Sequence, residues 1–225
     1  MGNLVEVLEV GSSLVHMVRI TGLEPELNIR FVPEELQAHA STATQHHIAK
    51  AILEQSDLPV TYLNIGASYM DNFLLLAPVI RRTGKMVWPS RLIGYLDPRD
   101  VGEIAANLLL SPDERNLRQF HDINNGQDLL ETEDVAQMLS DVLKCPIPHE
   151  GSREAFIALF DPVLSARSSQ PGAAGRVLSF IDFEKSKSSF LHLSDLAERL
   201  LGRKPTTLRS WFMEHGAAFV SEADL

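Results

Sequence analysis

The stretch from His46 to Phe73 constrains this chain most, because it holds a helix pattern, a turn and a strand pattern in immediate succession. Between Gln45 and Gln55 the apolar residues recur at steps of three and four, which predicts an amphipathic helix. Its buried stripe is expected to contain Ile48, Ala51 and Ile52, with Ala49 or Leu53. Residues 60–65, VTYLNI, are rich in β-branched and aromatic side chains and have no helical period. That pattern is typical of a strand covered on both faces, as in a parallel sheet.

Polar residues follow this strand at once. Gly66 ends the apolar run, and Ser68, Tyr69, Asp71 and Asn72 come just after it. Ligands of open α/β sheets bind at the carboxyl ends of the strands. We therefore predict that this loop faces a pocket, with Tyr69 as a catalytic candidate and Ser68, Met70, Asn72 and Phe73 as substrate contacts. In the alternative interpretation Asp71 caps the next helix, while Tyr69, Met70 and Phe73 pack into the core.

The other segments support an α/β fold. Residues 14–20 and 118–124 read as strands, and residues 85–96 as an irregular extended segment or hairpin. Helices are expected over 74–82, from Asp97 or Asp100 as cap, from Thr132 as cap, over 153–165 and from Leu208. Residues 176–192 show no clear period. The expected architecture is an incomplete Rossmann-like parallel sheet in residues 1–145, followed by a small helical lobe in residues 146–225.

Composition excludes several classes of protein. The formal net charge of −10 argues against binding to nucleic acid and to anionic membrane surfaces. No apolar run has the length of a membrane span. Cys145 is the only cysteine, so a disulfide framework is excluded, and a reducing, cytoplasmic location is expected. The histidines lack metal-ligand spacing, and no metal site is predicted.

Five segments resemble, in the right order, the NmrA-like branch of the atypical short-chain dehydrogenase/reductases. They are residues 46–63 with their helix, SDLP turn and VTYL strand, residues 69–73 (YMDNF), 95–102 (YLDPRDVG), 129–143 and 201–208 (LGRKPTTL). The resemblance implies an NAD(P)H-dependent reductase that acts on a small organic substrate in specialised metabolism. Thr21 stands where the family often has Ser, and Asn64-Ile65 where it has Arg-Pro, and we name Thr21 and Asn64 as candidate substrate contacts.

The chain departs from that family in its phosphate-binding motif. It has no G-x-x-G-x-x-G turn, the motif whose backbone N–H groups hold the pyrophosphate of the cofactor. The resemblance places the first strand pattern of this chain at the fifth strand of the family. We therefore expect that NAD(P)H is not bound by this chain alone. A further hypothesis is that the chain is a truncated product that does not fold stably.

His46 and Lys50 lie four residues apart and so share one face of the predicted helix. In spacing they resemble the Tyr-x-x-x-Lys pair of the wider superfamily, with His46 in the place of the proton donor. We name His46, Lys50 and Tyr69 as catalytic candidates, since histidine exchanges protons near neutral pH. The alternative is a solvated helix face that carries two polar residues.

Three functions remain open from the sequence. The first is an oxidoreductase-type protein without its nucleotide half, and the second is a cofactor-independent isomerase or cyclase that uses the same pocket. The third is a non-catalytic binding or regulatory protein. In each case the partner is a small molecule, and the open edge of the first strand predicts a homo-oligomer.

Overall fold

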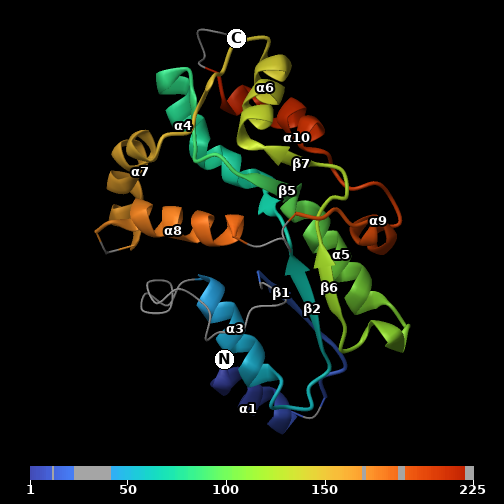
Figure 1. The fold of residues 1–225 in the computed structure, drawn as a ribbon. Helices are drawn as coiled ribbons and strands as arrows, with labels where there is room; N and C mark the ends of the chain where they lie inside the picture. The colour runs from blue at the N-terminus through green and yellow to red at the C-terminus, as the bar shows by residue number, and fades with distance from the viewer. Residues whose placement is uncertain (12, 23–41, 169–170, 187–190, 221–225) are drawn as a thin grey trace.

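The computed structural model describes residues 1–11, 13–22, 42–168, 171–186 and 191–220 (Figure 1). Its strands are β1 (Met17–Thr21), β2 (Val60–Ile65), β3 (Ser68–Tyr69), β4 (Met86–Val87), β5 (Leu92–Leu96), β6 (Phe120–Ile123), β7 (Leu129–Glu131) and β8 (His149–Glu150). Its α-helices are α1 (Gly2–Gly11), α3 (Thr42–Leu53), α4 (Phe73–Thr83), α5 (Pro98–Leu110), α6 (Thr132–Leu143), α7 (Arg153–Ser168), α8 (Ala173–Lys185), α9 (Leu196–Leu201) and α10 (Leu208–His215). Short 3-10 helices are η2 (Met70–Asn72), η3 (Glu114–Asn116) and η5 (Gly216–Ala218).

A parallel sheet of order β1-β2-β6 forms the lower half of the molecule. Thr21 pairs in register with Asn64, and Asn64 with Asp122, so the three strands end at one edge. Two smaller sheets lie beyond this edge: β5 pairs with β3 in parallel and with β7 in antiparallel orientation, and β4 pairs with β8. The predicted α/β fold with a parallel sheet and a helical C-terminal region is confirmed.

Helices cover both faces of the three-stranded sheet, as the pattern of β2 requires. On one face Leu63 packs with Ile104 and Leu108 of α5, and on the other Val60 and Tyr62 pack with α1 and α3. All six residues of β2 are buried. This agrees with the predicted strand covered on both sides.

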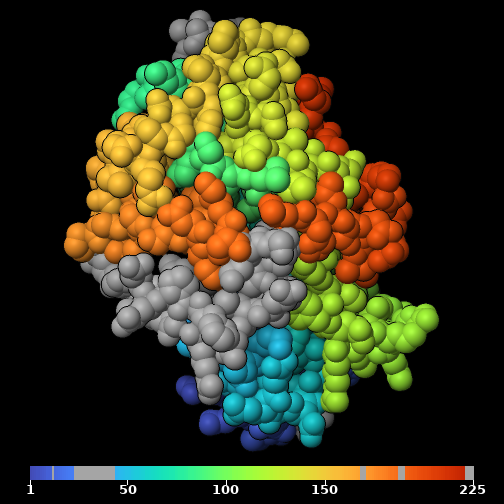
Figure 2. All heavy atoms as spheres, in the orientation of Figure 1, coloured from blue at the N-terminus to red at the C-terminus, as the bar shows by residue number. Residues whose placement is uncertain are grey.

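The largest apolar cluster lies beyond the carboxyl edge of the sheet, among α4, α6, α7, α8 and α10. It draws residues from Met70 to Phe219, and so from both sides of the boundary expected at residue 146, which stays a prediction. In Figure 1 α8 lies above the level of the sheet's carboxyl edge and α3 lies below it, and Figure 2 shows atoms of α8 on this face of the molecule.

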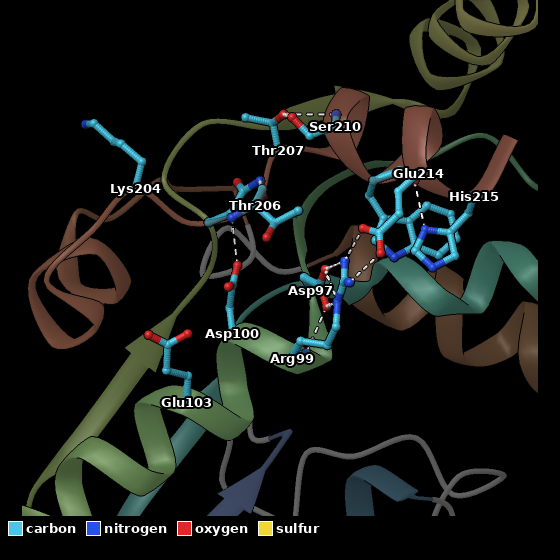
Figure 3. A network of polar contacts seen from close by, with 12 residues as sticks. Asp97, Arg99, Asp100, Glu103, Lys204, Thr206, Thr207, Ser210, Glu214 and His215 are labelled. Atoms are coloured by element: carbon cyan, nitrogen blue, oxygen red, sulfur yellow. Dashed lines mark hydrogen bonds and ion pairs between the residues drawn. The ribbon is translucent and has the colours of Figure 1, made fainter.

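The C-terminal segment is anchored to the start of α5 (Figure 3). Asp97 caps α5 by accepting the backbone N–H of Arg99 at 2.8 Å, as predicted. Asp100, fully buried, accepts the backbone N–H of Thr206 and the guanidinium of Arg203, each at 2.7 Å. Arg99 in turn bridges to Glu214 on α10. These contacts hold the segment between α9 and α10, and α10 itself, against the start of α5.

Four local details differ from what the sequence indicated. α3 buries Ala49 and Leu53, which the predicted stripe included as alternatives, while Ile48 and Ala51 are exposed. Residues 85–96 form the irregular extended segment and not the hairpin of the two alternatives, because β4 and β5 pair with other strands. Thr132 is the first residue of α6 rather than its cap, since its hydroxyl is held by the 89–91 segment. Residues 173–185 form helix α8, where no period was recognised. Within the described ranges, no helix has the length and hydropathy to cross a membrane.

Candidate functional site

A cavity of about 560 Å³ lies at the carboxyl edge of the parallel sheet. Its lining comes from the ends of β1 and β2, from α3, from the β3 region and from α8. Among the predicted site residues, the lining contains Thr21, His46, Ser68, Tyr69 and Asn72. A volume of this size suits a small organic ligand. The fold therefore brings these residues together at the edge where ligands of α/β sheets bind.

The other predicted site residues lie outside this cavity lining. Lys50 pairs with Glu54 and lies 5.6 Å from the centre of the Tyr62 ring, on the side of α1 and α3. Asn64 is buried behind Thr21, and Met70 is fully buried in the core. Phe73 packs on Phe212 with 5.1 Å between the ring centres. The catalytic role of Lys50 and the substrate contacts of these residues stay predictions.

His46 presents a half-buried imidazole to the cavity. Burial lowers its pKa from the ordinary 6.5, and the nearby charges of Arg19 and His47 lower this pKa further. Its Nδ1 atom is buried and has no hydrogen-bond partner within the described residues. Gly22 lies against the ring, since a Cβ atom there would be 3.7 Å from it. The imidazole is therefore neutral at pH 7 and able to accept a proton.

A ladder of hydrogen bonds crosses the three strand ends behind the cavity. Thr21 Oγ1 donates to Asn64 Oδ1 at 2.8 Å, and Asn64 Nδ2 donates to Asp122 Oδ1 at 2.8 Å. His192 Nε2 lies 3.4 Å from Asp122 Oδ2. The carboxylate only accepts, which orients the Asn64 amide and makes the hydroxyl of Thr21 the donor. The Thr21 hydroxyl can therefore accept a hydrogen bond from a ligand but cannot donate one to it.

Tyr69 and Ser68 add two hydroxyl groups from β3. Burial raises the pKa of Tyr69, and the neighbouring charge of Asp71 raises this pKa further. The phenol therefore stays protonated at neutral pH and can donate a hydrogen bond. Ser68 accepts a hydrogen bond from the Arg91 guanidinium at 3.2 Å. Both Tyr69 and Ser68 are part of the cavity lining.

Sequence reasoning missed the two charged residues of this cavity, Arg91 and Glu184. Arg91 Nη1 donates to Glu184 Oε2 at 2.6 Å, and each side chain is only 12% exposed. Burial raises the pKa of Glu184, and the positive charge of Arg91 opposes that rise. The two residues are 93 positions apart, in segments where no regular element had been recognised. No motif or period in the sequence marked either of them.

Comparisons with known proteins show the fold class. No family profile and no curated protein sequence matches this chain significantly. Solved structures do match: an NADPH-dependent quinone oxidoreductase from Escherichia coli aligns with a TM-score of 0.71 and 18% identity, over 96% of this chain and 72% of its own. A nucleoside-diphosphate-sugar epimerase from Staphylococcus aureus aligns with a TM-score of 0.70 and 18% identity, over 94% of this chain and 68% of its own. The Citrobacter sp. triphenylmethane reductase complexed with NADP(H) aligns with a TM-score of 0.68 and 17% identity, over 95% of this chain and 69% of its own.

The chain therefore has the Rossmann-like fold of these reductases and epimerases. In fold, these comparisons agree with the resemblance that the sequence motifs indicated. The identities lie far below the range in which an activity follows from a likeness, so what the neighbours share with this chain is the fold.

The described residues at the strand ends do not fit the pyrophosphate of a dinucleotide. A phosphate cradle needs glycines that open the backbone to the ligand. At Gly66 the space that a Cβ atom would take is filled by Asp122, whose Oδ1 would lie at 2.9 Å. At Gly22 the corresponding space is bounded by the ring of His46. A carboxylate at this edge repels phosphate, and within the part of the chain that the structure describes no cluster of metal-ligating side chains is present to offset it.

Proposed function

We propose that this chain is an oxidoreductase-type protein that binds a small organic substrate of specialised metabolism in the cavity between α3 and α8. Redox turnover then needs a nucleotide-binding surface that this chain does not supply by itself. The reductase fold of the neighbours supports the first part of the proposal. The lack of a G-x-x-G-x-x-G turn and the carboxylate of Asp122 at the strand ends support the second.

The cavity itself carries the proposal. It combines a neutral imidazole, a phenol, two aliphatic hydroxyls, an amide and the Arg91–Glu184 ion pair with the apolar side chains of Ile65, Ile93 and Phe180. Ligand sites combine an apolar wall with polar groups that orient the ligand in this way.

Calorimetry with two kinds of probe tests both parts. Cinnamyl alcohol, a neutral aromatic probe, should bind, and Phe180→Ala should weaken that binding because Phe180 lines the cavity. Ile157→Ala on α7, exposed and outside the cavity lining, is the matched control and should leave binding unchanged. NADPH and NADH should give no binding heat with the folded chain. If the Phe180→Ala variant binds cinnamyl alcohol as tightly as the wild type, the cavity proposal is wrong. Micromolar binding of NADPH would contradict the second part of the proposal.

The state of His46 favours a second candidate, a cofactor-independent isomerase or cyclase. A neutral imidazole whose buried Nδ1 has no hydrogen-bond partner among the described residues is a group that can take and return a proton. Tyr69, protonated at neutral pH, would then supply a hydrogen bond to the developing oxyanion. Replacing His46 abolishes turnover in this case and leaves ligand binding largely intact, whereas a pure binding protein shows no turnover at all.

A further inference from the structure

A row of three polar side chains borders the cavity where it meets the parallel sheet. Thr21, Asn64 and Asp122 stand near the carboxyl ends of β1, β2 and β6 and are in register with one another. Thr21 is only 1% exposed, and of the three it is the residue that lines the cavity. What a ligand meets at this wall therefore depends on how the protons of the row are arranged.

The hydrogen bonds of this row run in one direction, from Thr21 towards Asp122. A carboxylate only accepts, so the group of Asn64 that faces Asp122 is the amide nitrogen, and Nδ2 donates to Oδ1 at 2.8 Å. The amide oxygen of Asn64 consequently faces Thr21 and takes its hydroxyl proton, also at 2.8 Å. A threonine hydroxyl has one proton and two lone pairs. Asp122 thus makes Thr21 an acceptor, although it does not line the cavity itself.

An acceptor at this buried wall distinguishes ligands by their protons. A ligand hydroxyl can donate to Thr21 Oγ1, and it does so where water competes little. The oxygen of a ketone brings only lone pairs to the same place and is desolvated there without a partner. The protonated phenol of Tyr69, in the same lining, is a donor. A hydroxyl group can complement both residues, whereas a ketone can complement only Tyr69.

The charges and apolar groups of the lining indicate the rest of the ligand. Arg91 and Glu184 are paired with each other, so the two charged residues of the lining compensate one another and attract neither an anion nor an ammonium group. Ile65, Ile93 and Phe180 offer apolar surface. A neutral molecule with an apolar skeleton fits these surroundings.

We propose that the cavity selects neutral, apolar alcohols over the corresponding ketones, with Thr21 as the acceptor for the ligand hydroxyl and Asp122 as the positioning residue. This inference rests on the proposed function and names the class of substrate that the cavity takes. The selectivity follows from the direction of the hydrogen bonds in the row, which Asp122 sets through Asn64.

Calorimetry with benzhydrol and benzophenone tests this selectivity. The two probes share one carbon skeleton, carry no charge and differ in whether the oxygen bears a proton. The folded wild-type protein should bind benzhydrol about fivefold tighter, the difference that one net hydrogen bond supplies. In Asp122→Asn the new amide can donate to Asn64, which allows Asn64 to turn and Thr21 to donate. The preference of this variant should fall to about twofold or less. A purely structural role of Asp122 would weaken both probes alike and leave the preference at the wild-type value.

Three further variants sharpen the result. Thr21→Ser keeps the hydroxyl and should keep the preference, whereas Thr21→Val removes the acceptor and should abolish it. Asp113→Asn makes the same chemical change as Asp122→Asn at an exposed cap of η3 and should leave the preference unchanged. If the wild type binds the ketone as tightly as the alcohol, or if Asp122→Asn keeps the full preference, the inference is wrong while the cavity proposal stands. If neither probe binds, the cavity proposal fails as well.

Discussion

His46 is the residue whose surroundings bear most directly on the chemistry of the site. Its ring lines the cavity, Gly22 lies against it, and Arg19 adds an unfavourable charge for the protonated form. Both burial and charge act in the same direction, so the neutral form is favoured. In the proposed isomerase or cyclase, His46 would therefore act first as a base and not as an acid.

We predict that the imidazole of His46 titrates below 6.5, and that His46→Gln makes the fold less sensitive to acid. In the unfolded chain the ring takes up a proton near 6.5, whereas in the folded chain it does so only at lower pH. Stability is therefore lost as pH falls through 6.5, until the folded-state pKa is passed. Histidine NMR titration, with the variant to assign the signal, measures this pKa. A His46 signal that titrates at or above 6.5 would contradict the prediction.

The sequence indicated the hydroxyl and imidazole groups of the site but not its ion pair. Thr21 and Ser68 follow recognisable strands, and the ends of parallel strands meet at one edge, so their proximity follows from the fold class. Arg91 precedes a strand whose pairing depends on β3 and β7. Glu184 meets it only because α8 packs over the cavity, a tertiary arrangement that no local pattern contains.

At the scale of elements, the junction between α5 and the C-terminal segment depends on a buried carboxylate. Asp100 in the first turn of α5 accepts from the backbone of Thr206 and from Arg203. The start of a helix also favours a negative charge. Glu103, one turn further along α5, reaches the same Arg203 but is exposed. The two acids thus share a partner and differ in burial.

We predict that Asp100→Ala destabilises the fold by about 2–3 kcal/mol, because it leaves a backbone N–H unsatisfied and removes a charge-assisted bond. Glu103→Ala on the same helix should cost about 0–0.5 kcal/mol, as expected for an exposed ion pair. Urea denaturation of both variants measures the difference. Equal costs would show that the junction does not depend on the buried carboxylate.

Local signals predicted most helices and strands, and the failures have identifiable causes. The VTYLNI strand and the helix expected from Leu208 have strong local signals, and each is found in place. In α8 the core stripe through Leu178 and Ile181 is accompanied by Phe180, which faces the cavity and blurs the helical period. β7 has three residues, and its pairing with β5 decides its conformation.

At the scale of the molecule, the described part of the chain leaves one side of the parallel sheet open. β1 pairs with β2 and with no other strand that the structure describes. Ile20 on β1 is 44% exposed, and α1 exposes Leu4, Val7 and Val10 at steps of three residues. An apolar strand edge beside an apolar helix stripe is typical of a surface that is covered in solution.

We predict that the chain forms a homodimer through the β1 edge. Two copies related by a two-fold axis pair the same patch with itself, so one edge suffices for both. Ile20→Lys should give a monomer, because a lysine on an edge strand opposes pairing with another strand. Met213→Lys on α10 adds the same charge at an exposed site on a different element and should remain dimeric. Sedimentation velocity distinguishes these states. A monodisperse wild-type monomer, or a dimer that survives Ile20→Lys, would rule out this edge as the interface.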